Sequence, residues 1–213
     1  MIGDTTTGTI DAANFNVGLG VDVFAALTSG DDNVAVGYGA LTANTTGSDN
    51  VAIGKVALDA NTTASNNTAV GNASMTANTT GAGNTGVGSS SLNANTTGAN
   101  NVAVGKDVLD ANTTGGSNVG MGFNALGANT TANYNVAIGT RAAETNTIGT
   151  QNVAIGGQAL RYNTEGENLV AIGYSALYNN TTADDNVAIG AFSLDANTTG
   201  ANNTAIGNNA LGA

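Results

Sequence analysis

The stretch NVAVGYGALTANTTGSD, residues 33–49, is the unit from which nearly the whole chain is built. Its fifth residue, Gly37, belongs to a series of glycines that recur every 17 residues without insertion or deletion. Self-similarity at a fixed period is the signature of a repeat protein, in which each repeat stacks on its neighbours. We number the places of a repeat from its asparagine, so that Asn33 is place 1 and Asp49 is place 17. The glycines at place 5 are Gly20, Gly37, Gly54, Gly71, Gly88, Gly105, Gly122, Gly139, Gly156, Gly173, Gly190 and Gly207.

The composition excludes several classes of function. The chain has 213 residues, no Pro, Cys, His or Trp, and a formal net charge of −11. Without Cys and His, thiol nucleophiles, imidazole acid–base catalysis and the usual zinc ligands are ruled out, so we expect no enzyme, no catalytic residue and no cofactor. An acidic chain repels phosphates, which makes nucleic acid an unexpected partner. No apolar run is long enough to cross a bilayer and residues 1–15 do not resemble a signal peptide, so we expect no membrane insertion.

Apolar residues alternate with small or polar ones around each place-5 glycine. Places 2 and 4 are mostly β-branched, as in Val51 and Ile53, whereas places 1, 3 and 5 carry Asn, then Ala or Gly, then Gly. Because side chains alternate along a strand, we expect places 2 and 4 to face a core and the flat Ala/Gly side to face other copies. The Ala-Leu pair at places 8 and 9 predicts a second short strand, and Asn-Thr-Thr-Gly at places 12–15 predicts the closing turn.

Two strands and two bends per repeat describe one rung of an all-β parallel β-solenoid, or β-roll, with about twelve rungs of 17 residues. Residues 16–213 are the predicted repeat domain, and residues 1–15, with the strand-like TTTGTI, are a predicted N-terminal cap or joining strand. One rung buries too little apolar surface to offset the entropy of ordering its chain, so rungs must stabilise one another. The interior stays thin even when stacked, which favours a closed cyclic oligomer over the alternative, a monomer.

The repeats depart most from their consensus between residues 141 and 178. Side chains typical of recognition surfaces gather there, in a chain otherwise poor in charge and aromatic rings. They are candidate contacts for a glycan or a protein, and the alternative is neutral variation at exposed places. At place 10, Glu144 precedes Arg161 by one rung, which predicts a surface ion pair. The candidate ligand-binding residues are Arg141, Arg161, Tyr162, Tyr174 and Tyr178.

Acidic residues stack at the end of two successive repeats. Asp32 and Asp49 share place 17, and Asp31 lies beside them. Carboxylate oxygens in this arrangement are a candidate calcium site. A solvated acidic edge is the simpler interpretation, so we expect no bound metal.

The asparagine at place 12 has two interpretations. In eight repeats it begins a glycosylation sequon, which a eukaryotic secretory route would modify. Asn146 and Asn163 nevertheless persist where Ile148 and Glu165 remove the sequon, so a turn or a stacked amide ladder explains the column better. The sequon asparagines are Asn44, Asn61, Asn78, Asn95, Asn112, Asn129, Asn180 and Asn197.

The cores NVAVG, NVAIG, NTAVG and NTAIG resemble the head repeats of YadA-like trimeric autotransporter adhesins. The longer form, with ALxANTTG after the glycine, is similar also to repeats of phage tail fibre proteins. The resemblance covers residues 16–213 and implies a left-handed β-roll, a homotrimer, an extracellular, cell-surface or virion-surface location, and attachment to a host surface or glycan. The repeat is a few residues longer than that of the adhesins, and these 213 residues contain no heptad stalk or membrane barrel, so we expect either a head fragment of such a fibre or a complete subunit.

Three functions follow as expectations. The first is a non-enzymatic structural or adhesive fibre segment that displays places 6, 7, 10 and 11. The second is a self-assembling extracellular filament, in which the unfinished last rung joins the lead segment of the next molecule. The third is an ice-binding solenoid, because threonines repeat at places 13 and 14. Adjacent extended residues point to opposite sides, however, which predicts only one outward file of threonines.

Overall fold

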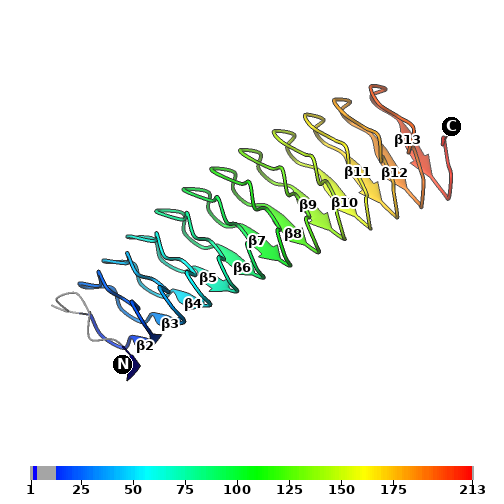
Figure 1. Cartoon of the computed structure of the whole chain (residues 1–213). Coiled ribbons are helices and arrows are strands. Elements are labelled where there is room, and N and C mark those ends of the chain that lie inside the picture. Colours follow the sequence, from blue (N-terminus) through cyan, green and yellow to red (C-terminus); the bar gives the residue numbers. More distant parts are fainter. Residues whose placement is uncertain (1, 4–12, 213) are drawn as a thin grey trace.

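In the computed structural model, which describes residues 2–3 and 13–212, the chain forms one parallel sheet of 13 strands in sequence order. Figure 1 shows the coils stacked in a row, with the strands along one side and narrow turns on the other. This confirms the predicted parallel β-solenoid, with about 11 rungs of 17 residues and no helix among the described residues. The strands are β1 (Ile2–Gly3), β2 (Val17–Gly20), β3 (Val34–Val36), β4 (Val51–Ile53), β5 (Thr68–Val70), β6 (Thr85–Val87), β7 (Val102–Val104), β8 (Val119–Met121), β9 (Val136–Ile138), β10 (Val153–Ile155), β11 (Val170–Ile172), β12 (Val187–Ile189) and β13 (Thr204–Ile206).

Equivalent places of successive rungs pair with each other along the whole sheet. Ala35 in β3 pairs with Ala52 in β4, and every later pair keeps the same register. The ladder also extends before residue 16, because Ile2 in β1 pairs with Leu19 in β2. The TTTGTI stretch of the predicted cap, residues 5–10, lies outside the described residues, so the boundary between cap and repeat domain stays a prediction.

The two faces of the sheet are the reverse of the sequence prediction. The middle residue of each strand, at place 3, points inward, and Ala35 and Ala52 are fully buried. Places 2 and 4 point outward, so that Ile53 is 39% exposed and Ile138 is 38% exposed. The prediction that the β-branched residues face the core, and that the Ala/Gly side faces other copies, is therefore wrong.

Leucines from the opposite wall explain this reversal. Leu41 and Leu58 at place 9 are fully buried in one core cluster with the alanines of places 3 and 8. In an interior packed to normal protein density, a leucine reaching across a thin coil leaves room only for a small residue on the sheet. Where the opposite wall is bulkier, place 3 is glycine: a Cβ added at Gly120 would lie 2.5 Å from Val108 Cγ1. Place 3 therefore faces the core because its Ala or Gly is small enough to fit, and the larger Val and Ile at places 2 and 4 face outward.

The Ala-Leu pair belongs to a run of turns and not to a second strand. Places 7 and 9 have positive φ, as at Val56 (51°) and Leu58 (50°), which is a strained conformation for bulky side chains. Backbone bonds between rungs hold it: Leu41 N–H donates to Ala57 O at 3.1 Å, and Val56 N–H donates to Tyr38 O at 2.8 Å. The predicted second strand is therefore wrong, and each described rung contributes one strand to the sheet.

The strict recurrence of glycine at place 5 has a steric cause. Gly54 has φ 145°, a conformation that other residues rarely adopt, and a Cβ added there would lie 2.2 Å from the carbonyl oxygen of Gly71. No side chain can be accommodated without separating the rungs. Place 5 is therefore glycine because each rung passes directly against the next.

Two files of buried asparagine side chains run along most of the rod; Leu169 interrupts the first file, and the second begins after Leu27. In the first file, Asn50 N–H donates to Asn33 Oδ1 at 3.0 Å, and Asn50 Nδ2 donates to Ala64 O at 2.9 Å. In the second, Asn61 Nδ2 donates to Asn44 Oδ1 at 2.9 Å and to the same Ala64 carbonyl at 3.0 Å. Buried polar groups need such partners, and the files supply them from rung to rung, with Asn67 Nδ2 as an exception that has no hydrogen-bond partner among the described residues. This confirms the stacked amide ladder at place 12 and adds a second one at place 1.

Candidate functional site

Arg161 is the centre of the group of recognition residues predicted from the sequence. Its Nε donates to Glu144 Oε2 at 2.6 Å, which confirms the predicted ion pair, and its Nη1 donates to the Tyr178 hydroxyl at 3.2 Å. The guanidinium carbon lies 5.1 Å from the centre of the Tyr162 ring, within cation–π range. Tyr162 and Tyr178 meet edge to face at 5.0 Å. The arginine is therefore held in one orientation by Glu144 and Tyr178 from the two neighbouring rungs and by Tyr162 of its own rung.

The ionisation of this cluster follows from the same contacts. The hydrogen bond that Arg161 donates to Glu144 raises the pKa of Arg161, so the guanidinium stays charged. Interaction with the Tyr178 side chain raises the pKa of Tyr162, so its hydroxyl stays protonated at neutral pH. The side chains of Arg161 and Glu144 are each 18% exposed. A ligand would consequently meet the tyrosine rings and a largely covered charge, and not a free cation.

Places 6 and 7 form a second file of aromatic and cationic residues beside the first. Arg141 Nε lies 3.7 Å from Glu144 Oε1, so Glu144 links the two files. The Phe123 ring has Lys106 Nζ at 5.7 Å and Arg141 Cζ at 6.0 Å from its centre. We call the combined area the aromatic–cation surface; it comprises Lys106, Phe123, Arg141, Glu144, Arg161, Tyr162, Tyr174, Tyr178 and Phe192.

Tyr174 lies apart from the Arg161 cluster. It meets Phe192 edge to face at 5.4 Å, and half of its surface is exposed. Phe123, Phe192 and Lys106 were not among the candidates, although all three occupy places 6 or 7, which Arg141 and Tyr174 also occupy. Grouping residues by place, and not by distance along the chain, would have found them. Exposed rings on a rigid backbone suit stacking against an apolar ligand face.

The calcium candidates lie at turn positions. Asp31 Oδ1 accepts a hydrogen bond from Asn14 N–H at 2.6 Å. Asp32 and Asp49 have φ of 56° and 59°, a left-handed conformation that Asp tolerates well. Within residues 2–3 and 13–212, no three His, Cys, Asp or Glu side chains gather closely enough to hold a metal ion. The turn explains the aspartates at place 17, and calcium binding stays a prediction.

The sequon asparagines are the residues of the second amide ladder. Asn112 is fully buried, and its Nδ2 donates to Asn95 Oδ1 at 2.8 Å and to Gly115 O at 2.9 Å. A glycan is attached through this same nitrogen and would need space that the folded rungs do not leave. Asn197, in the second-last rung, is the most accessible of the eight. The folded structure is therefore incompatible with sugars on the seven buried sequons.

Both threonines of the closing turn reach solvent, to different extents. Thr46 at place 14 is exposed, whereas Thr45 at place 13 is half-buried and donates its hydroxyl to Thr62 O at 3.0 Å. The prediction of a single outward file assumed an extended chain, but these residues lie in a turn. The place-13 hydroxyl hydrogens are used between rungs, so only the place-14 file presents free donors to solvent.

Comparisons with models of known families, with curated proteins and with solved structures find no match. Among the described residues there is no helix long and apolar enough to span a membrane. The geometry therefore defines the class on its own: a parallel β-solenoid repeat protein with about 11 regular rungs of 17 residues.

Proposed function

We propose that the protein is a non-enzymatic structural segment of an adhesive fibre, whose copies associate side by side through the outward face of the sheet. The observation that supports this is a continuous aliphatic surface at places 2 and 4 of β2 to β13. Its residues are Val17, Leu19, Val34, Val36, Val51, Ile53, Thr68, Val70, Thr85, Val87, Val102, Val104, Val119, Met121, Val136, Ile138, Val153, Ile155, Val170, Ile172, Val187, Ile189, Thr204 and Ile206.

The size of this surface reaches the upper limit of what a lone chain usually exposes. Twelve strands spaced by about 4.8 Å and two outward residues wide make a strip of roughly 600 Å². The largest apolar patch of a typical monomer is about 300–600 Å², and larger ones mark interaction sites. The strip carries no charged residue in a chain of net charge −11, so it is the face on which copies approach without repulsion.

Two threonines within the strip favour a parallel, in-register arrangement. Thr68 and Thr85 are adjacent at place 2, near the N-terminal third of a file that is otherwise aliphatic as far as Thr204 in the last strand. In a cyclic oligomer the same rungs meet at one level, so the hydroxyls face each other. In an antiparallel pair they would meet aliphatic residues of the far rungs and lose hydrogen bonds with water. The resemblance to trimeric adhesin heads and phage tail fibres makes the homotrimer the arrangement we propose.

The adhesive part of the proposal rests on the aromatic–cation surface. It lies at places 6, 7, 10 and 11, in the run of turns that follows each strand and outside the strip of places 2 and 4, so association of the sheets leaves it accessible. Three copies would present three such surfaces, and linked weak sites bind more tightly than one alone. We propose a glycan or a protein of a host surface as the ligand, and an extracellular, cell-surface or virion-surface location.

The test compares two charged variants by sedimentation equilibrium. Ile138→Lys/Ile155→Lys places like charges on the outward sheet face, whereas Thr114→Lys/Thr131→Lys makes the same charge change at exposed place 14. We expect the wild type and the second variant to have three times the chain mass of 20.6 kDa at micromolar concentration. The first variant should associate at least about 100-fold more weakly, since it removes the central contacts.

Two results would contradict the proposal. If the wild type is a monomer at high micromolar concentration, the copies do not associate side by side and the proposal is refuted. Equal masses for both variants would show that a surface other than the outward sheet face joins the copies. Particles that lengthen with concentration would instead favour the end-to-end filament.

A further inference from the structure

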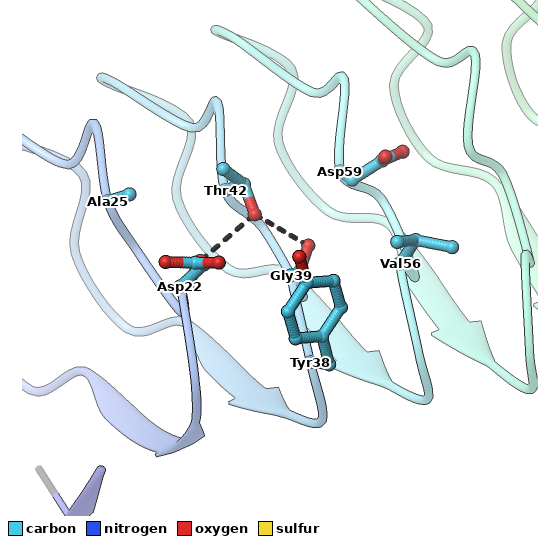
Figure 2. A pocket seen from close by; sticks show the side chains of 7 residues that line it. All are labelled: Asp22, Ala25, Tyr38, Gly39, Thr42, Val56 and Asp59. Atoms are coloured by element: carbon cyan, nitrogen blue, oxygen red, sulfur yellow. Dashed lines mark hydrogen bonds between the residues drawn. The ribbon is translucent and has the colours of Figure 1, made fainter. Parts of the chain in front are cut away.

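A pocket of about 330 Å³ opens on the outer wall near the N-terminal end of the rod. Figure 2 shows Asp22 and Asp59 on either side of Thr42, with the Tyr38 ring below them. Ala25 and Val56 supply the apolar part of the lining. These residues come from three successive rungs, and none belongs to the aromatic–cation surface.

The pocket exists because of a missing side chain. Gly39 occupies place 7, which is filled by a larger residue in the neighbouring rungs, Asp22 and Val56. A Cβ added at Gly39 would lie 3.4 Å from both Thr42 Oγ1 and Val56 Cγ1, in ordinary contact with the walls. Its φ of 67° is shared with non-glycine residues at the same place, such as Gln158 at 61°. The fold therefore does not require glycine here, and the missing side chain leaves the space open at this rung.

The polar groups of the pocket are almost all hydrogen-bond acceptors. Thr42 Oγ1 directs its hydrogen to the carbonyls of Asp22 at 2.9 Å and Gly39 at 2.8 Å, so only its lone pairs face the space. The carboxylates of Asp22 and Asp59 can only accept. Asp59 Oδ1 is buried and accepts no hydrogen bond among the described residues. The loss of hydration also raises the pKa of Asp59, as expected of a carboxylate that lacks a counter-charge.

We infer that this pocket binds a primary alkylammonium group, supplied by a free amine or by a lysine side chain of another chain. An ammonium brings three donors and a positive charge to two carboxylates that form no ion pair among the described residues. The Tyr38 ring, 54% exposed, offers its face to the cation, and Ala25 and Val56 can contact the alkyl stem. An anion is excluded by the two carboxylates, and a neutral alcohol would leave them without a counter-charge.

The experiment measures binding of n-butylammonium by saturation-transfer NMR at physiological salt, with n-butanol as the uncharged probe. Asp22→Asn/Asp59→Asn removes the pocket's charges at places 7 and 10. Asp107→Asn/Asp110→Asn removes the same charge at the same two places of another rung. We expect the first variant to weaken binding at least tenfold and the second to leave it unchanged.

Gly39→Gln supplies a second test, because it fills the pocket without changing charge. It should abolish binding while the circular dichroism spectrum stays that of the wild type. Equal weakening by both double Asp→Asn variants, full binding by Gly39→Gln, or equal binding of n-butanol would each overturn the inference. Tighter binding of an Nα-acetyl-lysine amide than of n-butylammonium would identify a lysine side chain as the source, and the reverse order would identify a free amine.

Discussion

The inward and outward faces of the same three-residue strands follow opposite rules. Inward, at places 1 and 3, the residues are Asn and Ala, small or polar and yet fully buried. Outward, at places 2 and 4, they are Val and Ile, apolar and yet partly exposed. In a coil this thin, the volume of a side chain and its ability to form hydrogen bonds determine whether it is buried more than its hydrophobicity does. The apolar residues that do not fit inside one chain make the surface on which a second chain can pack.

The largest expected effect separates the two faces directly. Leu109→Ala empties a fully buried place 9, and we expect a loss of about 2–5 kcal/mol in the free energy of unfolding. Val102→Thr, on the outward face, should change it by no more than about 0.5 kcal/mol, since Thr85 already occupies that place in the preceding strand. Urea denaturation under conditions where the chain is monomeric measures both. Similar losses for the two variants would refute the assignment of the faces.

A smaller effect is expected for the buried polar residues. Asn112→Ala removes one hydrogen bond each from Asn95 Oδ1, Asn129 Nδ2 and the Gly115 carbonyl. Asn129 Nδ2 keeps the Ala132 carbonyl and the Gly115 carbonyl keeps Asn101 Nδ2, so Asn95 Oδ1 loses the most. We expect a loss of about 1–3 kcal/mol, the penalty for buried groups without hydrogen bonds. Asn72→Ala, at exposed place 6, is the control and should change the free energy of unfolding by less than about 0.5 kcal/mol. Urea denaturation of the two variants measures both changes. An equal loss of unfolding free energy in both variants would mean that the asparagine ladder does not stabilise the fold.

The smallest effect concerns Asp110, on the wall between the interior and solvent. Partial burial, and then the nearby charge of Asp107, raise the pKa of Asp110 above its usual 3.8. The folded state therefore holds this proton to higher pH than the unfolded state does. Its contribution to stability is present below pH 3.8 and is lost as the pH rises through the folded pKa.

The check is a urea titration at several pH values. Asp110→Asn should flatten the fall in the free energy of unfolding across this window, and Asp107→Asn should flatten it partly. A steeper fall in Asp110→Asn than in the wild type would show that the carboxylate is stabilised when charged.

Much of the candidate site could be predicted, because stacking puts residues of equal place next to each other. The Glu144–Arg161 pair followed from place 10 alone. The orientation of Arg161 toward Tyr162 and Tyr178 did not, because it depends on side-chain packing across three rungs. The pocket at Gly39 could not be predicted either, because the sequence contains many glycines and only the positions of the surrounding side chains show that this one leaves an open space.

By itself, the sequence determined the period, the parallel register and the stacking of the rungs, because exact repetition lets identical backbone groups pair from rung to rung. It also indicated that places 2 and 4 share one face. Only the tertiary structure decided which face is inside. Alternation along a strand does not say what the opposite wall contributes, and here the place-9 leucines, reached through turns with positive φ, fill the interior. The sheet could then supply only Ala, Gly and hydrogen-bonded Asn, and its Val and Ile were left on the surface.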